Sequence, residues 1–263
     1  MGRTITIASG KGGVGKTTIT ANLGIALAKR GKKVLLIDAD IAMANLSLIL
    51  GMQSSPITLH DVLLGEAVVQ DAIYDGPGGI FFVPSGLSLE SYRRVDSERL
   101  ASVVKAVAND FDFVFLDAPA GIEKNVMAAI NASEETLLVT QPNAPALADV
   151  LKTKIVSQRL GKKPIGIIVN FVMNERGEIS DEDLMRMIEL PVYGLVPFDA
   201  EVRKSFMQEK VAPLVLRAPN SPAAIAIQKT AAKLAGLPVE FMHGKREGFL
   251  SRILSIFSRN KKQ

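Results

Sequence analysis

Apolar and polar positions follow two different periods along most of the chain. Short runs of β-branched and aromatic residues predict strands at residues 4–9, 33–38, 79–84, 112–117, 136–141, 164–170 and 191–196. Amphipathic segments of helical length predict helices at residues 16–30, 97–109, 145–160, 181–188 and 220–235. Residues 113–116 and 165–169 are continuously apolar, which indicates strands covered on both faces. The pattern predicts an α/β fold with a mostly parallel central sheet of seven or eight strands and helices on both faces.

The division of the chain follows from its punctuation and charge. No repeat, low-complexity tract or long linker interrupts residues 1–240, so we expect one domain there. Pro238, Gly244 and Gly248 then break up a charged stretch, which predicts a flexible basic tail at residues 241–263. Residues 244–263 hold six basic side chains and one acidic one, which leaves the other 243 residues at −1 of the total charge of +4. The cationic element is therefore the tail and not the globular body.

Composition excludes several kinds of chemistry. The chain has no cysteine, which rules out disulfides, thiolate zinc sites, a cysteine nucleophile and cysteine-ligated iron–sulfur clusters. Its two histidines, His60 and His243, are too far apart in sequence to suggest a histidine metal site. No leader-like segment precedes the first strand, and no apolar run reaches the roughly 18 residues of a membrane span. We therefore expect a cytoplasmic protein.

A glycine-rich loop follows the first predicted strand and opens the first predicted helix. It reads Gly10-Lys11-Gly12-Gly13-Val14-Gly15-Lys16-Thr17-Thr18, which fits the phosphate-binding pattern G-x-x-x-x-G-K-[ST]. Its glycines allow backbone N–H groups to converge on phosphate oxygens, and the helix N-terminus adds partial positive charge. Lys16 is expected to reach the β- and γ-phosphates, and the Thr17 hydroxyl to bind magnesium. The loop predicts that the protein binds ATP with Mg²⁺.

Two residues of this loop have open roles. Thr18 can hold the α-phosphate or simply cap the helix. Lys11 is a second lysine inside the loop, and it can be solvated or lie on the phosphates beside Lys16. Spacing alone does not decide between these alternatives.

Three aspartates follow predicted strands at the edge where ligand sites form in parallel sheets. Asp38 and Asp40 follow the strand at 33–38, and Asp117 ends the strand at 112–117. Phosphoryl transfer needs an acid for the magnesium shell and a group that orients the attacking water. We predict Asp117 at the metal and Asp40 at the water, although strand-terminal aspartates also cap helices. The small residues at 117–121 predict a tight loop that senses the γ-phosphate or a mere turn.

These segments resemble a known family. The loop with its additional Lys11 resembles the deviant Walker A motif of the MinD/ParA ATPases. The segments IDADIAMANL at 37–46 and DAPAGIE at 117–123 resemble the two switch regions of that family's MinD branch, and the resemblance extends over nearly the whole chain to GFLSRILSIFSR at 248–259. It implies a slow ATPase that forms an ATP-dependent homodimer with the nucleotides between its subunits. It also implies a role in spatial positioning, such as choice of the division site, with MinC-like or MinE-like partners or another cargo.

The resemblance also assigns roles to individual residues, among them Asp38, which would support the magnesium site. Lys11 would reach across the dimer to the partner's phosphates and act in catalysis with Lys16 and Asp40. Asp149 matches the acid that pairs with this lysine in the monomer. The resemblance places Asn170, Pro197 and Asp199 at the adenine base. The sequence departs from the family pattern at three positions, Ala44, Asn143 and Phe171. At the position of Phe171, related archaeal-type sequences often have arginine.

The end of the chain predicts an amphipathic helix at residues 248–259. On a helical wheel its apolar residues fall within an arc of roughly 160°. They are Phe249, Leu250, Ile253, Leu254, Ile256 and Phe257. Serines and arginines occupy the other side, which is typical of an interfacial helix attracted to anionic lipid. We expect the protein to be reversibly peripheral at the inner face of the cell membrane, although such a helix can also pack on its own domain or on a partner.

Three other functions fit the same sequence less well. A ParA-like segregation or array-positioning ATPase that binds DNA would need a basic globular surface, and a body at −1 makes specific nucleic-acid binding improbable. An iron–sulfur assembly carrier of a related type would need a Cys-x-x-Cys pair. A kinase-like transferase would need an acceptor pocket and an arginine-bearing lid, and the sequence shows neither.

Overall fold

The computed structural model describes residues 2–52, 55–86, 94–173, 175, 178–179, 181–207 and 211–238. The predicted basic tail at 241–263, with its helix at 248–259, lies outside the described residues. Among the residues that are described, no helix has both the length and the apolar character needed to cross a bilayer.

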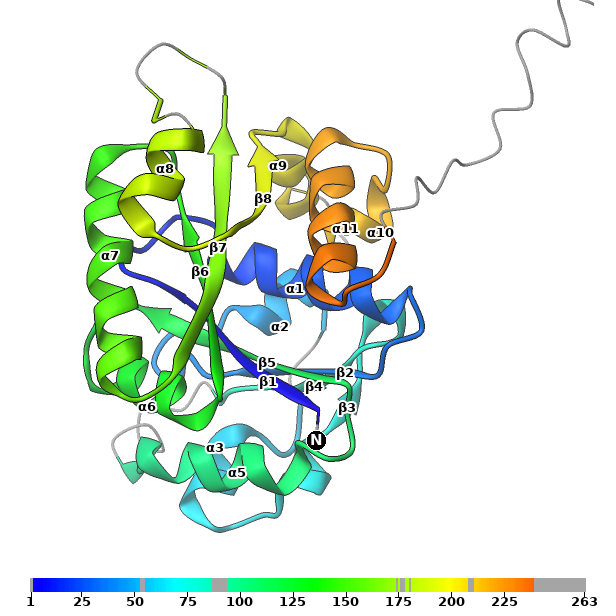
Figure 1. The fold of residues 1–263 in the computed structure, drawn as a ribbon. Helices are drawn as coiled ribbons and strands as arrows, with labels where there is room; N and C mark the ends of the chain where they lie inside the picture. Colours follow the sequence, from blue (N-terminus) through cyan, green and yellow to red (C-terminus); the bar gives the residue numbers. More distant parts are fainter. Residues whose placement is uncertain are drawn as a thin grey trace, which may run out of the picture.

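The described chain folds around one sheet of eight strands in the order β3-β4-β2-β5-β1-β6-β7-β8 (Figure 1). The strands are β1 Arg3–Ser9, β2 Val34–Asp38, β3 Tyr74–Asp75, β4 Phe81–Val83, β5 Phe113–Ala120, β6 Glu135–Thr140, β7 Lys163–Val172 and β8 Val192–Pro197. All neighbouring pairs are parallel except β3 with β4, an antiparallel pair at one edge. The predicted mostly parallel sheet is confirmed.

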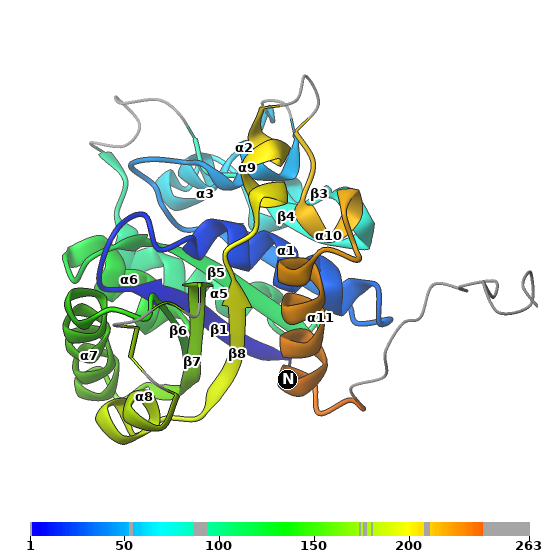
Figure 2. The same cartoon turned by 90° about the horizontal axis from the view of Figure 1, so that it is seen from above.

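Helices cover both faces of this sheet (Figures 1 and 2). On one face lie α1 Lys16–Ala28, α2 Leu46–Leu50, α10 Leu214–Arg217 and α11 Pro222–Leu234, with α9 Ala200–Phe206 next to α10. On the other face lie α3 Leu59–Leu64, α5 Leu100–Val107, α6 Lys124–Ala132, α7 Ala144–Arg159 and α8 Asp181–Ile188. Three short 3₁₀ turns complete the described part: Val69–Ala72, Pro77–Gly79 and Ser97–Arg99. The inner strands β1, β2, β5, β6 and β7 are buried over most of their length, as their apolar runs predict, whereas the edge strands β3 and β8 are only partly buried.

Several predicted boundaries change in the structure. The helix expected at 97–109 begins as the 3₁₀ turn Ser97–Arg99 before α5. The prediction of a loop at 117–121 is wrong, because β5 continues to Ala120 and pairs there with Ser9. Gly121 then turns the chain at φ 100°, and its N–H donates to the Ser9 carbonyl over 3.1 Å. The switch-like segment therefore begins as a strand and bends only at the glycine.

Asp199 connects three elements at the carboxyl end of β8. One carboxylate oxygen accepts the Glu201 N–H and caps α9, and the other accepts the Ala223 N–H at the start of α11 over 3.1 Å. Burial alone would raise the pKa of Asp199, but these hydrogen bonds outweigh it and lower the pKa below its usual value. The ionised carboxylate thus holds α9 and α11 against the end of β8.

Because its folded-state pKa is lowered, Asp199 contributes stability above its unfolded pKa, and this contribution disappears as pH falls through the folded value. We expect Asp199→Asn to lower the free energy of unfolding at pH 7 by roughly 1–2 kcal/mol, since an amide accepts only one of the two hydrogen bonds well. The deficit should shrink as pH falls from the unfolded pKa through the lowered folded value, because the wild-type carboxyl then becomes protonated and resembles the amide. Urea unfolding across this pH range measures it, with the exposed Asp71→Asn as control. A deficit that does not depend on pH would contradict the charge-based account.

Candidate functional site

The loop 10–18 connects β1 to α1 at the carboxyl end of the sheet. Gly13 and Gly15 have φ values of 78° and 86°, a backbone conformation that favours glycine. Side chains from β1, from the residue after β6 and from β7 anchor three carbonyls of the loop. Ser9 donates to the Lys11 carbonyl, Gln141 to the Gly13 carbonyl and Asn170 to the Val14 carbonyl, over 3.0, 3.3 and 2.9 Å.

The N-terminus of α1 completes this loop. Its first turn has no preceding turn to accept its N–H groups, so these donors are available to an anion. No acidic residue stands in that first turn. With its carbonyls held by neighbouring side chains, the loop has the construction of a phosphate cradle, as the sequence predicts.

Lys16 and Asp117 form a buried ion pair beneath the loop. The Lys16 ammonium lies 3.0 Å from Oδ1 of Asp117, and the two side chains are 8% and 2% exposed. The Thr20 hydroxyl, one turn further along α1, donates to the same oxygen over 2.8 Å. Lys16 has three N–H donors, so it can keep Asp117 and still reach a phosphate.

Asp38 lies directly beside Asp117 because the two residues pair in register on β2 and β5. It is fully buried, and its oxygens accept the backbone N–H groups of Asp40 and Leu46 over 3.2 and 3.1 Å. Burial first, and then the Asp117 charge, raise the pKa of Asp38 well above its usual value despite these bonds. The ion pair of Lys16 with Asp117 therefore has a second buried carboxyl group, Asp38, beside it.

A divalent cation fits this arrangement. With both buried carboxyl groups ionised beside one ammonium, the site has an excess of negative charge, and a nearby cation would neutralise it and favour the ionised form of Asp38. Oxygen ligands suit Mg²⁺, which usually takes one or two carboxylates and completes its shell with phosphate oxygens and water. Thr17, Asp38 and Asp117 would hold the ion in this site. Asp38 and Asp117 lie side by side on β2 and β5, and Thr17 stands in the first turn of α1.

Asp40 lies at the more open side of the cluster, in the segment between β2 and α2. It is partly exposed, and one carboxylate oxygen accepts the Met43 N–H over 3.0 Å. Burial raises the pKa of Asp40, against the Met43 hydrogen bond and the charge of Lys16. Because the side chain is partly exposed, a water molecule can approach its carboxylate. This placement suits the role expected from the sequence.

Lys11 and Asp149 depart from the expected pairing. Asp149 lies beside the loop, since a Cβ on Gly10 would come within 2.2 Å of the Asp149 carbonyl oxygen. Its carboxylate, however, pairs with Lys152 at 3.1 Å on the same helix, and within the described residues no ion pair joins it to Lys11. Lys11 is exposed at the mouth of the loop. The predicted monomer pairing of Lys11 with Asp149 is therefore wrong for this structure.

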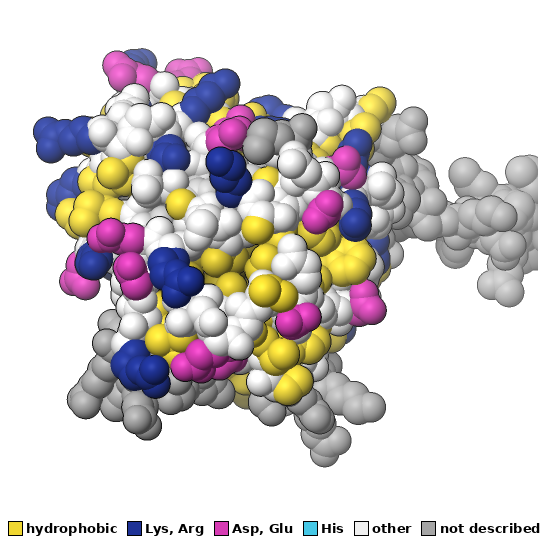
Figure 3. Space-filling view, turned by 90° about the horizontal axis from the view of Figure 1, so that it is seen from below, with side chains coloured by type: hydrophobic (Ala, Val, Ile, Leu, Met, Phe, Trp, Pro, Cys, Tyr) yellow, Lys and Arg dark blue, Asp and Glu magenta, His cyan; other side chains and the backbone are white. Residues whose placement is uncertain are grey.

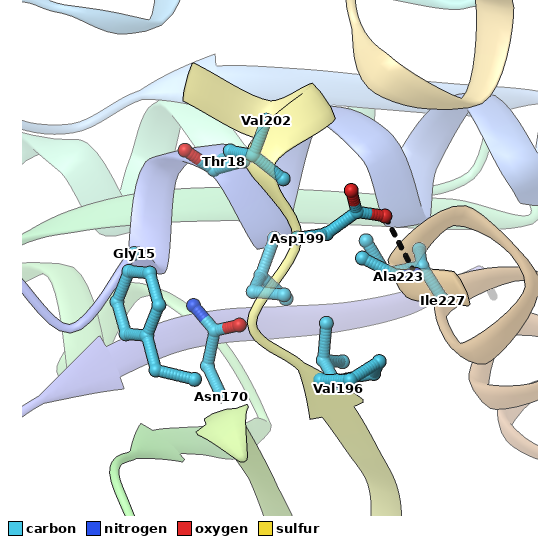
Figure 4. A pocket seen from close by; sticks show the side chains of 11 residues that line it. Gly15, Thr18, Asn170, Val196, Asp199, Val202, Ala223 and Ile227 are labelled. Atoms are coloured by element: carbon cyan, nitrogen blue, oxygen red, sulfur yellow. Dashed lines mark hydrogen bonds between the residues drawn. The ribbon is translucent and has the colours of Figure 1, made fainter. Parts of the chain in front are cut away.

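A small pocket adjoins the loop on the side of β7, β8 and α11 (Figure 4). Its lining includes Gly15 and Thr18 of the loop together with the three residues predicted to bind the base, Asn170, Pro197 and Asp199. Val196, Val202, Ala223 and Ile227 supply an apolar wall. The structure thus brings the predicted base-binding residues together within reach of the phosphate loop. The Asp199 carboxylate is occupied by α9 and α11, so this residue lines and braces the pocket.

Sequence analysis missed Thr20, Phe171 and Phe198. Thr20 resembles any helical threonine whose hydroxyl bonds the carbonyl four residues earlier, which it also does to Lys16 over 3.0 Å. Phe171 follows Asn170 directly and lines the pocket. Its departure from the family pattern was the available signal.

We expect Thr20→Val to weaken Mg²⁺-dependent nucleotide binding about 5-fold to 20-fold, because Asp117 loses a hydroxyl donor worth roughly 1–2 kcal/mol. Isothermal titration with ADP, with and without Mg²⁺, measures the effect. Thr230→Val is the matched control, since Thr230 is equally buried and its hydroxyl bonds only the Ala226 carbonyl of its own helix. Equal losses for both variants would remove Thr20 from the site.

Comparisons with known proteins agree with this geometry. Residues 5–212 match the family described as the CobQ/CobB/MinD/ParA nucleotide-binding domain. An uncharacterised ATP-binding protein of Methanocaldococcus jannaschii is 47% identical over 251 residues, which are 95% of this chain and 94% of that protein.

Two solved structures share both fold and sequence with this chain. The cell division ATPase MinD of Pyrococcus furiosus superposes with a TM-score of 0.86 at 40% identity, covering 90% of this chain and 100% of that one. The septum site-determining protein MinD of Pyrococcus horikoshii, complexed with Mg-ADP, gives 0.85 at 37% identity, covering 89% and 96%.

Proposed function

Since this chain belongs to the CobQ/CobB/MinD/ParA family of nucleotide-binding domains, we propose that it is a MinD-like ATPase that binds ATP with Mg²⁺ and hydrolyses it. The observation that carries the proposal is the buried cluster of Lys16, Asp117 and Asp38 directly beneath the loop. Such a cluster costs stability unless it serves a bound charge. A phosphate group and a magnesium ion together supply that charge.

Each residue of the cluster has a defined task in hydrolysis. Loop N–H groups and the Lys16 ammonium bind the phosphates, and Lys16 stabilises charge that develops on the β–γ bridge. Thr17, Asp38 and Asp117 would hold Mg²⁺, which would neutralise phosphate charge. Asp40 accepts a hydrogen bond from the attacking water and orients it toward the γ-phosphate. Asn170 and Pro197 enclose the base.

We propose further that two chains close on the nucleotides as a homodimer. Lys11 is exposed and lies apart from its expected partner Asp149, so its ammonium is available to a second subunit. Large apolar side chains are exposed nearby, with Met43 at 69% and Leu48 at 63%. A partner subunit would cover them. In this dimer Lys11 takes part in catalysis on the opposite nucleotide.

We propose that ATP binding and hydrolysis control membrane binding through the predicted tail at 241–263. We propose that the helix at 248–259 binds anionic lipid through Phe249, Leu250, Ile253, Leu254, Ile256 and Phe257. One short helix binds a bilayer weakly, but two on one dimer gain roughly 10²–10⁴-fold in avidity. ATP-driven dimerisation then recruits the protein from the cytoplasm to the inner face of the membrane, and hydrolysis releases it. This cycle serves spatial positioning such as division-site selection, through MinC-like or MinE-like partners or another cargo.

The second candidate is a ParA-like ATPase that positions DNA or a protein array. It needs a basic face on the globular body. On the face seen from below the view of Figure 1, Lys and Arg side chains are mixed with Asp and Glu around an apolar centre (Figure 3). This face offers no strong field for a phosphate backbone, and residues 1–243 carry a net charge of only −1, which favours the membrane model.

We expect Asp40→Ala to retain ATP binding but to lower the hydrolysis rate at least about 100-fold, since the water loses its orienting group. Membrane residence in ATP should lengthen correspondingly. Phosphate release and liposome co-sedimentation measure the two effects, with the exposed Asp71→Ala as control. Unchanged hydrolysis would remove Asp40 from the mechanism.

The tail model predicts that a truncation ending at Glu247 keeps ATPase activity and no longer sediments with anionic liposomes in ATP. A charge on the apolar stripe, Leu254→Glu, should abolish sedimentation, because a buried carboxylate is costly in lipid. The same charge on the polar side, Ser255→Glu, should reduce it only mildly. Sedimentation of the truncated protein, or equal effects of the two substitutions, would refute the tail model.

The DNA-binding alternative is tested on the same truncation. We expect no salt-dependent DNA binding from it in ATP at physiological ionic strength, because its remaining charge is close to neutral. Binding that is strong, ATP-dependent and lost with rising salt would favour the ParA-like candidate instead.

A further inference from the structure

Phe171 has an unusual backbone at the end of β7. Its φ is 60°, and it is one of two described non-glycine residues with positive φ. The register between β7 and β8 shifts at the same place, between Asn170 and Val172. A bulky side chain in the left-handed region is disfavoured, and such strain collects at functional sites. The packing that maintains this conformation directs the ring toward the loop.

Three contacts define where this ring lies. A Cβ on Gly15 would be 3.6 Å from Cε2 of Phe171, so the ring packs against the loop backbone. Phe171 also lines the pocket that holds Asn170 and Pro197. On its other side, its centroid is 6.4 Å from that of Phe198, with the rings tilted by 39°.

The large aromatic side chain of Phe198 is exposed to solvent, although nothing in the fold requires this exposure. Its side chain is 56% exposed, although it directly follows the pocket residue Pro197. Its backbone is fixed by a hydrogen bond from its N–H to the Val172 carbonyl over 2.9 Å and by the capping role of Asp199. Two aromatic rings are thus held rigidly beside a phosphate loop, one of them largely open to solvent.

We infer that Phe171 and Phe198 form the stacking surface for the purine base, an inference that rests on the proposed nucleotide-binding function. A nucleotide whose phosphates bind the loop would have its base on the side of β7 and β8. The pocket and the two rings lie on that side. Flat apolar faces stack on any base, so the rings supply affinity and leave recognition of the base edge to polar groups such as Asn170. The base in turn covers aromatic surface that is otherwise exposed.

The direct test compares ADP with inorganic pyrophosphate, which shares the phosphates but lacks the base. Titration calorimetry in Mg²⁺ should show that Phe171→Ala weakens ADP binding between about 5-fold and 150-fold and leaves pyrophosphate binding unchanged. Phe198→Ala should act in the same direction and is safe for folding because Phe198 is largely exposed. Phe171→Tyr keeps the ring and should retain wild-type affinity.

The strained backbone of Phe171 allows a second test of the stacking surface. Phe171→Gly relieves the positive φ and removes the ring, whereas Phe171→Ala removes the ring alone. The stacking surface predicts weak ADP binding for both variants. Recovery of ADP affinity in Phe171→Gly would overturn it, and so would an equal loss for ADP and pyrophosphate in either variant. If the wild type bound neither molecule, the proposed function itself would fail.

The absence of tryptophan from the chain allows a spectroscopic readout. Phe171→Trp introduces a single indole at the proposed surface, and stacking should quench its fluorescence when ADP binds but not when pyrophosphate binds. Phe81→Trp, on β4 near the far edge of the sheet, is the matched control and should not respond. Equal responses to ADP and pyrophosphate at position 171 would contradict direct stacking.

Discussion

The buried contact between Lys16 and Asp117, with Asp38 beside it, is the interaction on which the site depends. Burying two carboxyl groups next to one ammonium is costly, and burial together with the neighbouring charge raises the pKa of Asp38. The sheet imposes this arrangement, because β2 and β5 are parallel neighbours whose register places Asp38 opposite Asp117. The loop above it, with its carbonyls held by side chains, can receive phosphates, and the Mg²⁺ that accompanies them would balance the charge of the carboxyl groups.

From this cluster the rest of the nucleotide site extends in two directions. Toward α2, Asp40 stands at the open side, where a water molecule can approach. Toward β7 and β8, Asn170 ties the sheet to the loop and Asp199 fixes the starts of α9 and α11 around the base pocket. Because α11 both lines the pocket and leads to the tail, one helix joins the nucleotide to the proposed membrane anchor.

Sequence predicted the parts of this molecule that local pattern determines. The apolar runs predicted the seven main strands. The loop motif and the strand-terminal acids predicted the candidate nucleotide site. The antiparallel β3 has only two residues, and α6 carries neither a side-chain cap nor an acid in its first turn, so both escaped detection. Thr20 and the aromatic pair depend on tertiary geometry, since a threonine in a helix and a φ of 60° leave no periodic signal. The Asp149 pairing failed because Lys152, one turn away, is a nearer partner.

The central claim is that Lys16, Asp117 and Asp38 form a site for a nucleotide together with magnesium. Its most direct test is titration of the full chain with ADP in Mg²⁺ and in EDTA, for wild type and Lys16→Met. The account predicts tight binding that requires Mg²⁺ in the wild type and is lost in the variant. Equal affinity with and without Mg²⁺, or undiminished binding by Lys16→Met, would contradict it.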